Sequence, residues 1–209
     1  RVIPAGEAQG QIFGTFRGEP LLSRRYRIIH RGETLISIEE QFPAASFLDE
    51  QRVVVETPSR IHLGLLDMHG GIGRVDGGIG IALEEPGVLL EVSRARETTA
   101  RGGDQASREV ALRAAARVLA GIRATGGVEI SLRRVYPPHT GLGSGTQIAL
   151  AVARGIAELF GQVLPARELA RLTGRGGTSG IGTAAFETGG FIIDGGHAFG
   201  AGAEKDGFR

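Results

Sequence analysis

A glycine-rich segment that joins a strand to a helix carries the clearest chemical signal in this sequence. It reads Pro-Pro-His-Thr-Gly-Leu-Gly-Ser-Gly-Thr-Gln from position 137 to position 147. Apolar residues alternate before it, as in a strand, and recur after it at helical spacing. The first N–H groups of a helix lack intrahelical acceptors, and the helix dipole adds positive potential there. Because glycines let a backbone approach an anion closely, the segment predicts an anion site.

The phosphate-binding candidates are the nine residues that lead into this helix. Backbone N–H groups supply most of the expected donors, and two hydroxyl groups add to them. The alternative interpretation is a glycine-rich connection that binds no ligand. The candidates are His139, Thr140, Gly141, Leu142, Gly143, Ser144, Gly145, Thr146 and Gln147.

The amino-acid composition limits which groups can bind a phosphate in this chain. The chain has 35 glycines in 209 residues, roughly twice the usual share. Lys205 is the only lysine, which excludes a Walker-type loop because that loop needs a lysine after its glycine. Phosphate must therefore be held by backbone N–H groups, helix ends and arginine. The guanidinium group of arginine offers a planar fork for phosphate or carboxylate. Arg74 stands between loop glycines and is expected to have little packing to do.

Charge, cysteine content and hydropathy exclude several partner classes. The net charge of +1 favours neither nucleic acid nor an acidic membrane. There is no cysteine, and no run of about 18 apolar residues predicts a membrane span. We expect a cytoplasmic protein with no nucleic-acid or membrane partner. The chain begins at Arg1 rather than Met, and we expect a fragment at both ends.

The pattern of elements predicts an α+β fold in two blocks. Residues 1–47 contain a β-hairpin that turns at Gly32, and residues 42–51 form a linker. The second block, residues 52–209, begins with strands and ends with helices. Within it we expect a mobile loop over residues 97–105, a helix capped by Ser107, a second glycine-rich loop over residues 174–182 and a helical turn at residues 184–188.

The loop at 137–147 resembles the nucleotide-phosphate loop of the GHMP superfamily, which includes galactokinase, homoserine kinase and mevalonate kinase. In those kinases two serines usually follow the second glycine of the loop. In this sequence Ser144 is followed by Gly145 instead. The departure weakens a simple kinase prediction, so an ATP-dependent small-molecule kinase is kept as the alternative function.

Two further motifs resemble the β-ribofuranosylaminobenzene 5'-phosphate synthases of methanopterin biosynthesis. One spans residues 57–67 and 73–80, and the other spans residues 174–187 and 190–197. The resemblance covers residues 57–200 and implies a GHMP-type N-terminal domain, like domain 2 of ribosomal protein S5, without its C-terminal domain. It implies decarboxylative transfer of a ribosyl group from phosphoribosyl diphosphate to 4-hydroxybenzoate or 4-aminobenzoate, with release of carbon dioxide and diphosphate.

The resemblance also implies roles for individual residues. A base near the para group of the benzoate would help the ring carbon attack, and His62 or Asp67 is the candidate. Asp76 is a candidate for Mg²⁺ or a ribose hydroxyl group, although both aspartates also suit turns. We therefore expect Mg²⁺ as cofactor. A homodimer is kept as a possible assembly. The catalytic candidates are His62, Asp67, Arg74 and Asp76; the substrate-binding candidates are Arg60, Arg175, Gly176, Ser179, Gly180 and Gly182.

The first 45 residues resemble the C-terminal end of a chorismate lyase-like domain. The motif runs from Glu19 to Ile29 and from Ile38 to Pro43, and Glu40 aligns with an acid of that family. That family makes 4-hydroxybenzoate. Most of its fold is missing here, so no lyase activity is expected. A third interpretation of the whole chain is an inactive ligand-binding fragment.

Overall fold

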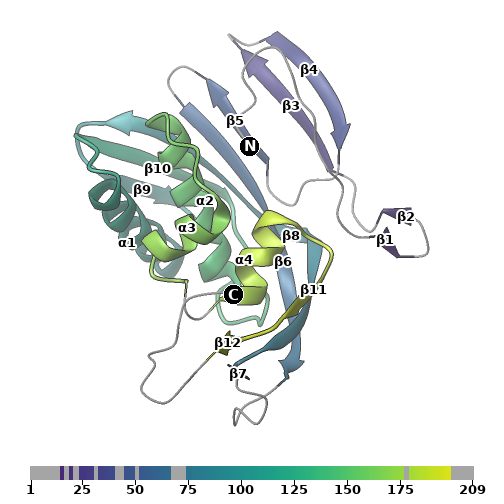
Figure 1. The fold of residues 1–209 in the computed structure, drawn as a ribbon. Helices are drawn as coiled ribbons and strands as arrows, with labels where there is room; N and C mark the ends of the chain where they lie inside the picture. The colour runs from purple at the N-terminus through teal and green to yellow at the C-terminus, as the bar shows by residue number, and fades with distance from the viewer. Residues whose placement is uncertain are drawn as a thin grey trace.

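The computed structural model describes residues 15–16, 19–20, 24–30, 33–40, 45–49, 52–66, 74–176 and 179–198 (Figure 1). Its main sheet has the strand order β5-β6-β8-β10-β9, and β11 pairs with β8 as well. The strands of this sheet are β5 (Ala45–Asp49), β6 (Arg52–Leu65), β8 (Gly78–Ala95), β9 (Thr99–Gly102), β10 (Gly127–Arg134) and β11 (Phe191–Asp194). The α+β fold class is confirmed.

Beside the main sheet, the described residues form three two-stranded sheets and four helices. The two-stranded sheets pair β1 (Thr15–Phe16) with β2 (Glu19–Pro20), β3 (Arg24–His30) with β4 (Glu33–Glu40), and β7 (Arg74–Val75) with β12 (His197–Ala198). The β3–β4 pair confirms the predicted hairpin, whose turn residue Gly32 lies outside the described residues. The helices are α1 (Gln105–Gly121), α2 (Ser144–Leu159), α3 (Ala166–Leu172) and α4 (Gly180–Glu187).

Helix α2 lies at the centre of the core, against β6 and β8 and in contact with the other three helices (Figure 1). Fourteen of its sixteen residues are buried, which explains its almost continuous apolar sequence. Valines and leucines on one face of β6 and β8 pack against it, because alternate strand residues point to the same side of a sheet. The strand residues of this contact include Val53, Val55, Val88, Leu90 and Val92. The core therefore fixes the position of the N-terminus of α2.

Gly155 allows α2 to approach the sheet closely. A Cβ atom at this position would lie 2.6 Å from Cγ2 of Val92. We expect Gly155→Ala to lower the free energy of unfolding by about 1–3 kcal/mol, which is typical of overpacking. Denaturant unfolding of Gly155→Ala, Val92→Ala and the double variant tests this. The double variant should lose less than the sum of the two single losses, and simple additivity would contradict the proposed contact.

Three elements differ from the sequence prediction, and each difference has a local cause. The expected linker contains β5, which pairs with β6. The expected mobile loop contains β9, which pairs with β10 in parallel; its polarity reflects an edge strand whose Arg101 lies 2.8 Å from Glu129. Helix α1 is capped by Asp104 rather than Ser107, because the Asp104 carboxylate accepts the Ser107 N–H at 2.7 Å.

The second glycine-rich loop also ends earlier than predicted. Helix α4 begins at Gly180, so the expected helical turn at residues 184–188 is the second half of a longer helix. Glycine is a poor helix former, which is why the pattern predicted a loop. The reason for a glycine at 182 is steric: a Cβ atom there would lie 2.9 Å from Cγ2 of Thr146 on α2. The glycine thus lets the first turns of α2 and α4 approach each other.

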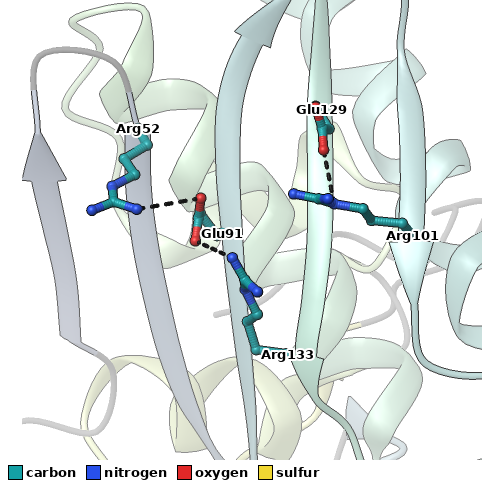
Figure 2. A network of polar contacts seen from close by, with 5 residues as sticks. All are labelled: Arg52, Glu91, Arg101, Glu129 and Arg133. Atoms are coloured by element: carbon teal, nitrogen blue, oxygen red, sulfur yellow. Dashed lines mark hydrogen bonds and ion pairs between the residues drawn. The ribbon is translucent and has the colours of Figure 1, made fainter.

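Ion pairs cover one part of the outer face of the sheet, where the start of β6, the end of β8, β10 and β9 lie side by side. Glu91 lies between Arg52, at 3.8 Å, and Arg133, at 3.0 Å, and Arg101 reaches Glu129 from the edge strand (Figure 2). This charged surface is typical of a solvated face, so the anion site must be sought on the helical side. Among the described residues, no helix is long and apolar enough to cross a membrane.

Candidate functional site

The loop before α2 folds back on itself through left-handed residues. Gly141 and Gly143 have φ angles of 80° and 78°, and His139 has a φ angle of 63°. Gly143 is the N-cap of α2 and has no side chain that could block the helix end. The N–H groups of Ser144 and Gly145 precede the first intrahelical hydrogen bond, so they remain available to an anion.

Arg60 of β6 lies directly against this loop. Its backbone N–H donates to the Leu142 carbonyl at 3.1 Å, and its Nη1 donates to the Gly141 carbonyl at 2.6 Å. A Cβ atom at Gly143 would lie 2.8 Å from the Arg60 guanidinium carbon. Burial lowers the pKa of Arg60, while the nearby Tyr136 opposes that shift. The guanidinium is therefore a half-buried positive charge placed over the helix entrance.

Tyr136 and Thr140 hold the loop from the other side. The Tyr136 hydroxyl donates to the Leu142 carbonyl at 3.1 Å, and the Thr140 hydroxyl donates to the Pro137 carbonyl at 3.0 Å. Tyr136 is 4% exposed, and its burial raises the pKa of its hydroxyl group. The Thr140 hydroxyl is thus occupied by the loop's own backbone, whereas its N–H remains a phosphate-binding candidate.

The N-terminus of α4 lies beside that of α2. The Thr146 and Ser179 hydroxyl oxygens are 3.3 Å apart, and the Gln147 side-chain amide donates to the Gly182 carbonyl at 2.9 Å. Ser179 occupies the N-cap position of α4, yet its side chain makes no capping hydrogen bond. Two helix N-termini place positive potential in the same region.

Arg175 completes the group from the turn after α3. Its Nη2 lies 3.4 Å from the position that a Cβ atom of Gly145 would occupy. Burial lowers the pKa of Arg175, and the charges of Arg113 and Arg117 lower it further. Gly176 packs beside Arg171, and Gly180 opens α4. The structure thus brings together both glycine-rich loops, Arg60 and Arg175, around a cluster of amide and guanidinium donors that suits a multiply charged anion.

His62 lies on the same side of β6 as Arg60, two residues along the strand. Its side chain is exposed, and a Cβ atom at Gly78 on the neighbouring strand would lie 2.6 Å from its Nε2. Asp76 has a φ angle of 62°, which confirms a turn conformation. Asp67 lies outside the described residues. Catalytic roles for His62, Asp67 and Asp76 remain predictions.

Arg74 makes hydrogen bonds that the sequence did not predict. Its Nε and Nη2 donate to the carbonyl oxygens of Gly195 and Gly196, both at 2.5 Å. The expectation that this side chain has little packing to do is wrong, because it ties β7 to the turn before β12. No contact among the described residues joins it to the phosphate loop, and its catalytic role remains a prediction.

We expect Arg74→Ala to destabilise the protein by about 1.5–3 kcal/mol, because hydrogen bonds from a charged donor are lost and two carbonyl groups are left without it. Chemical denaturation measures this change, and Arg74→Lys should recover part of it. Lost ligand binding with unchanged stability would contradict the structural role and support the catalytic one.

Two residues at the site were not found from the sequence. Tyr136 follows the strand and precedes two prolines, and a buried hydroxyl at such a boundary needs a partner. Arg117 of α1 is the second residue, and its Nη1 donates to the Thr173 carbonyl at 2.7 Å. Helical spacing placed Arg117 beside the core stripe, but only the packing of α1 against α3 shows what it reaches.

The comparisons with known proteins agree with this geometry. Residues 109–190 match the family model described as GHMP kinases N terminal domain. The chain carries a GHMP-type N-terminal domain. The match runs from α1 through the phosphate loop to the residue before β11, so it includes Arg175 and the α4 N-terminus. The resemblance of the loop to GHMP enzymes is confirmed.

Curated relatives of this GHMP-type chain share one name. The chain is 45% identical over 168 residues to the Beta-ribofuranosylphenol 5'-phosphate synthase of Methanocaldococcus jannaschii. The match covers 75% of this chain and 51% of that protein. The chain is also 49% identical over 144 residues to the protein of that name from Archaeoglobus fulgidus, covering 69% of this chain and 45% of that protein. The predicted resemblance to ribofuranosyl phosphate synthases is confirmed, and the chain spans about half the length of these relatives.

A solved structure supports the fold of the GHMP-type domain. A crystal structure of a proposed sugar kinase from Campylobacter jejuni has a TM-score of 0.50 with 15% sequence identity, covering 69% of this chain and 52% of that chain. At this identity the likeness shows the fold alone. The chorismate lyase-like character of the first 45 residues remains a prediction.

Proposed function

We propose that the chain binds phosphoribosyl diphosphate at the α2 N-terminus and transfers its ribosyl phosphate group to a benzoate. The observation that carries this proposal is the convergence of two helix N-termini, Arg60 and Arg175 on one glycine-rich loop. Diphosphate departure develops negative charge, and preorganised N–H and guanidinium donors stabilise such charge in the transition state.

The reaction balances without a redox partner. The ring carbon that bears the carboxylate, para to the hydroxyl group, attacks C1 of the ribose with a π-electron pair. The bond from C1 to diphosphate oxygen breaks, and diphosphate leaves with that electron pair. The bond from the ring to the carboxylate then breaks, its electrons restore the aromatic ring, and carbon dioxide leaves. A base near the para hydroxyl group would raise the nucleophilicity of the ring, and we propose His62 for this role because it lies on the Arg60 side of β6.

We propose 4-hydroxybenzoate as the acceptor in preference to 4-aminobenzoate. The names of the relatives specify a ribofuranosylphenol product. Decarboxylative transfer to 4-hydroxybenzoate yields a phenol, whereas 4-aminobenzoate would yield an aniline.

We propose that Mg²⁺ enters with the diphosphate. Among the described residues, no group of three histidine or acidic side chains is placed to hold a metal ion. Mg²⁺ does not need three protein ligands, because it keeps several water ligands and binds through substrate phosphates with one or two carboxylates. Asp76 and Asp67 are the candidate carboxylates, and the ion would screen the charge of the diphosphate.

Isotope release tests the proposed reaction. The protein is incubated with phosphoribosyl diphosphate, Mg²⁺ and carboxyl-labelled 4-hydroxybenzoate or 4-aminobenzoate. We expect labelled carbon dioxide and equimolar diphosphate, with the hydroxy acid as the better substrate. Formation of ADP from ATP and a small alcohol, without labelled carbon dioxide, would support the kinase alternative.

Ligand-induced stabilisation gives a readout that does not require turnover. Phosphoribosyl diphosphate at 100 times its Kd should stabilise the folded state by about 2.7 kcal/mol. If neither phosphoribosyl diphosphate nor ATP raises the melting temperature, the phosphate loop binds neither ligand and the proposal fails.

A further inference from the structure

The middle of α1 reaches the turn that presents Arg175. Arg117 Nη1 donates to the Thr173 carbonyl at 2.7 Å. Its guanidinium also packs against Gly174, which has a φ angle of 73° and leaves no room for a Cβ atom beside Arg117. Arg175 follows directly and lies against Gly145 of α2. A continuous set of contacts therefore runs from α1 to the phosphate loop.

Arg113 adds a further positive charge on the same side of α1. It precedes Arg117 by four residues, so the two side chains lie on one helix face, one above the other. Arg113 lies 3.6 Å from Glu109 in an exposed ion pair. Among the described residues, neither Arg117 nor Arg175 has a carboxylate within ion-pair distance. Both α1 arginines are close enough to lower the pKa of Arg175, after the larger effect of its burial.

Arg117 and Arg175 meet around the turn at Thr173 and Gly174, and Arg113 lies one helical turn before Arg117. Positive charges on neighbouring side chains repel one another, and a bound anion would offset that repulsion. The phosphate loop supplies rigid backbone donors, which suit a leaving group whose charge grows during the reaction. The arginine side chains are more flexible and more exposed than the backbone N–H groups of the loop. Such donors suit a phosphate whose charge does not change during the reaction. Such a phosphate contributes binding energy equally in the ground state and the transition state.

We propose that Arg113, Arg117 and Arg175 form a second anion subsite, which holds the phosphate monoester of a ligand whose diphosphate occupies the phosphate loop. The inference rests on the proposed function and deepens it, because phosphoribosyl diphosphate carries a diphosphate and a separate 5'-phosphate. Arg117 also acts as a positioning residue, since it holds the carbonyl group two residues before Arg175.

Calorimetric titration with three probes separates the two subsites. The probes are inorganic diphosphate, ribose 5-phosphate and phosphoribosyl diphosphate, each with Mg²⁺, and the variants are Arg113→Gln and Arg117→Gln. We expect each variant to weaken phosphoribosyl diphosphate and ribose 5-phosphate binding roughly tenfold, as for one charge-assisted hydrogen bond. Diphosphate binding should change less than about twofold in Arg113→Gln, the residual effect of a distant charge. In Arg117→Gln it should fall less than ribose 5-phosphate binding does, because Arg117 also positions Arg175, which lies against the phosphate loop.

Arg167→Gln is the matched control. Arg167 is exposed on α3, and within the described residues it makes neither a hydrogen bond nor an ion pair. Its removal changes the net charge by the same amount, so affinity for all three probes should stay at the wild-type level. A loss of diphosphate binding in Arg113→Gln equal to the loss of phosphoribosyl diphosphate binding would overturn the second subsite.

The wild-type protein distinguishes failure of the inference from failure of the proposed function. Phosphoribosyl diphosphate that binds no more tightly than inorganic diphosphate would overturn the second subsite and leave the phosphate loop intact. Wild-type protein that binds neither probe would overturn both. Arg117→Lys keeps the charge, so recovered ribose 5-phosphate binding in this variant supports the electrostatic role.

Discussion

Gly143→Val is expected to reduce diphosphate affinity at least about a hundredfold, the effect of losing one or more preorganised oxyanion donors. Gly143 is the N-cap of α2 and has a φ angle of 78°, which a β-branched residue rarely adopts. A Cβ atom there would lie 2.8 Å from the Arg60 guanidinium carbon. The valine side chain would therefore displace the Arg60 guanidinium. It would also cover the free N–H groups at the N-terminus of α2. Titration with diphosphate and Mg²⁺ measures the loss.

Gly161→Val is a matched control at the other end of the same helix. Gly161 also has a positive φ angle, 71°, but a Cβ atom there meets no atom within 4 Å. Both variants carry backbone strain of about 1–3 kcal/mol, so both melting temperatures should fall, and that of Gly143→Val should fall further because it also displaces Arg60. Only Gly143→Val should lose diphosphate binding. Equal diphosphate affinity in the two variants would remove the phosphate loop from the site.

The sequence predicted the site best where function depends on local backbone. The order strand, glycine-rich loop and helix N-terminus follows from short-range periodicity, and it located Gly141, Gly143 and Gly145 correctly. Arg60 and Arg175 were also predicted beside this loop, and the structure places both there. Their placement came from family motifs, because spacing alone cannot show which of 24 basic residues approach one loop.

The errors concern partners that are distant in sequence. Arg74 was expected to have little packing to do because it stands between loop glycines, yet its acceptors are carbonyl groups more than a hundred residues away. The periodicity of α1 likewise does not reveal the partner of Arg117, because Thr173 follows α3, more than fifty residues later in the chain. The residues of β9 were interpreted as a mobile loop because an edge strand that carries Arg101 on its outer face has the polarity of a loop. Long-range packing decides each case, and hydrophobic periodicity does not record it.

Arg60→Gln is expected to weaken diphosphate binding by about ten- to a hundredfold, because it removes a half-buried charge that the loop itself positions. The hydrogen bond to the Gly141 carbonyl uses Nη1, and Nη2 lies 3.2 Å from the position that a Cβ atom of Gly143 would occupy, at the entrance of the helix. A buried cation is costly without an anion, so bound diphosphate should recover this cost in the wild-type protein. Arg60→Lys should restore affinity only in part, since an ammonium group cannot bond the loop and the anion as a planar fork does.

Tyr136→Phe separates the charge of Arg60 from the shape of the loop. The Tyr136 hydroxyl donates to the same Leu142 carbonyl that accepts the Arg60 backbone N–H, so its loss relaxes the loop and leaves the charge in place. We expect Tyr136→Phe to lower diphosphate affinity less than about tenfold, with the salt dependence of the wild-type protein. Arg60→Gln should instead flatten the salt dependence, because one fewer charge contacts the anion. If both variants lose affinity equally with unchanged salt dependence, Arg60 shapes the loop and does not contact the diphosphate.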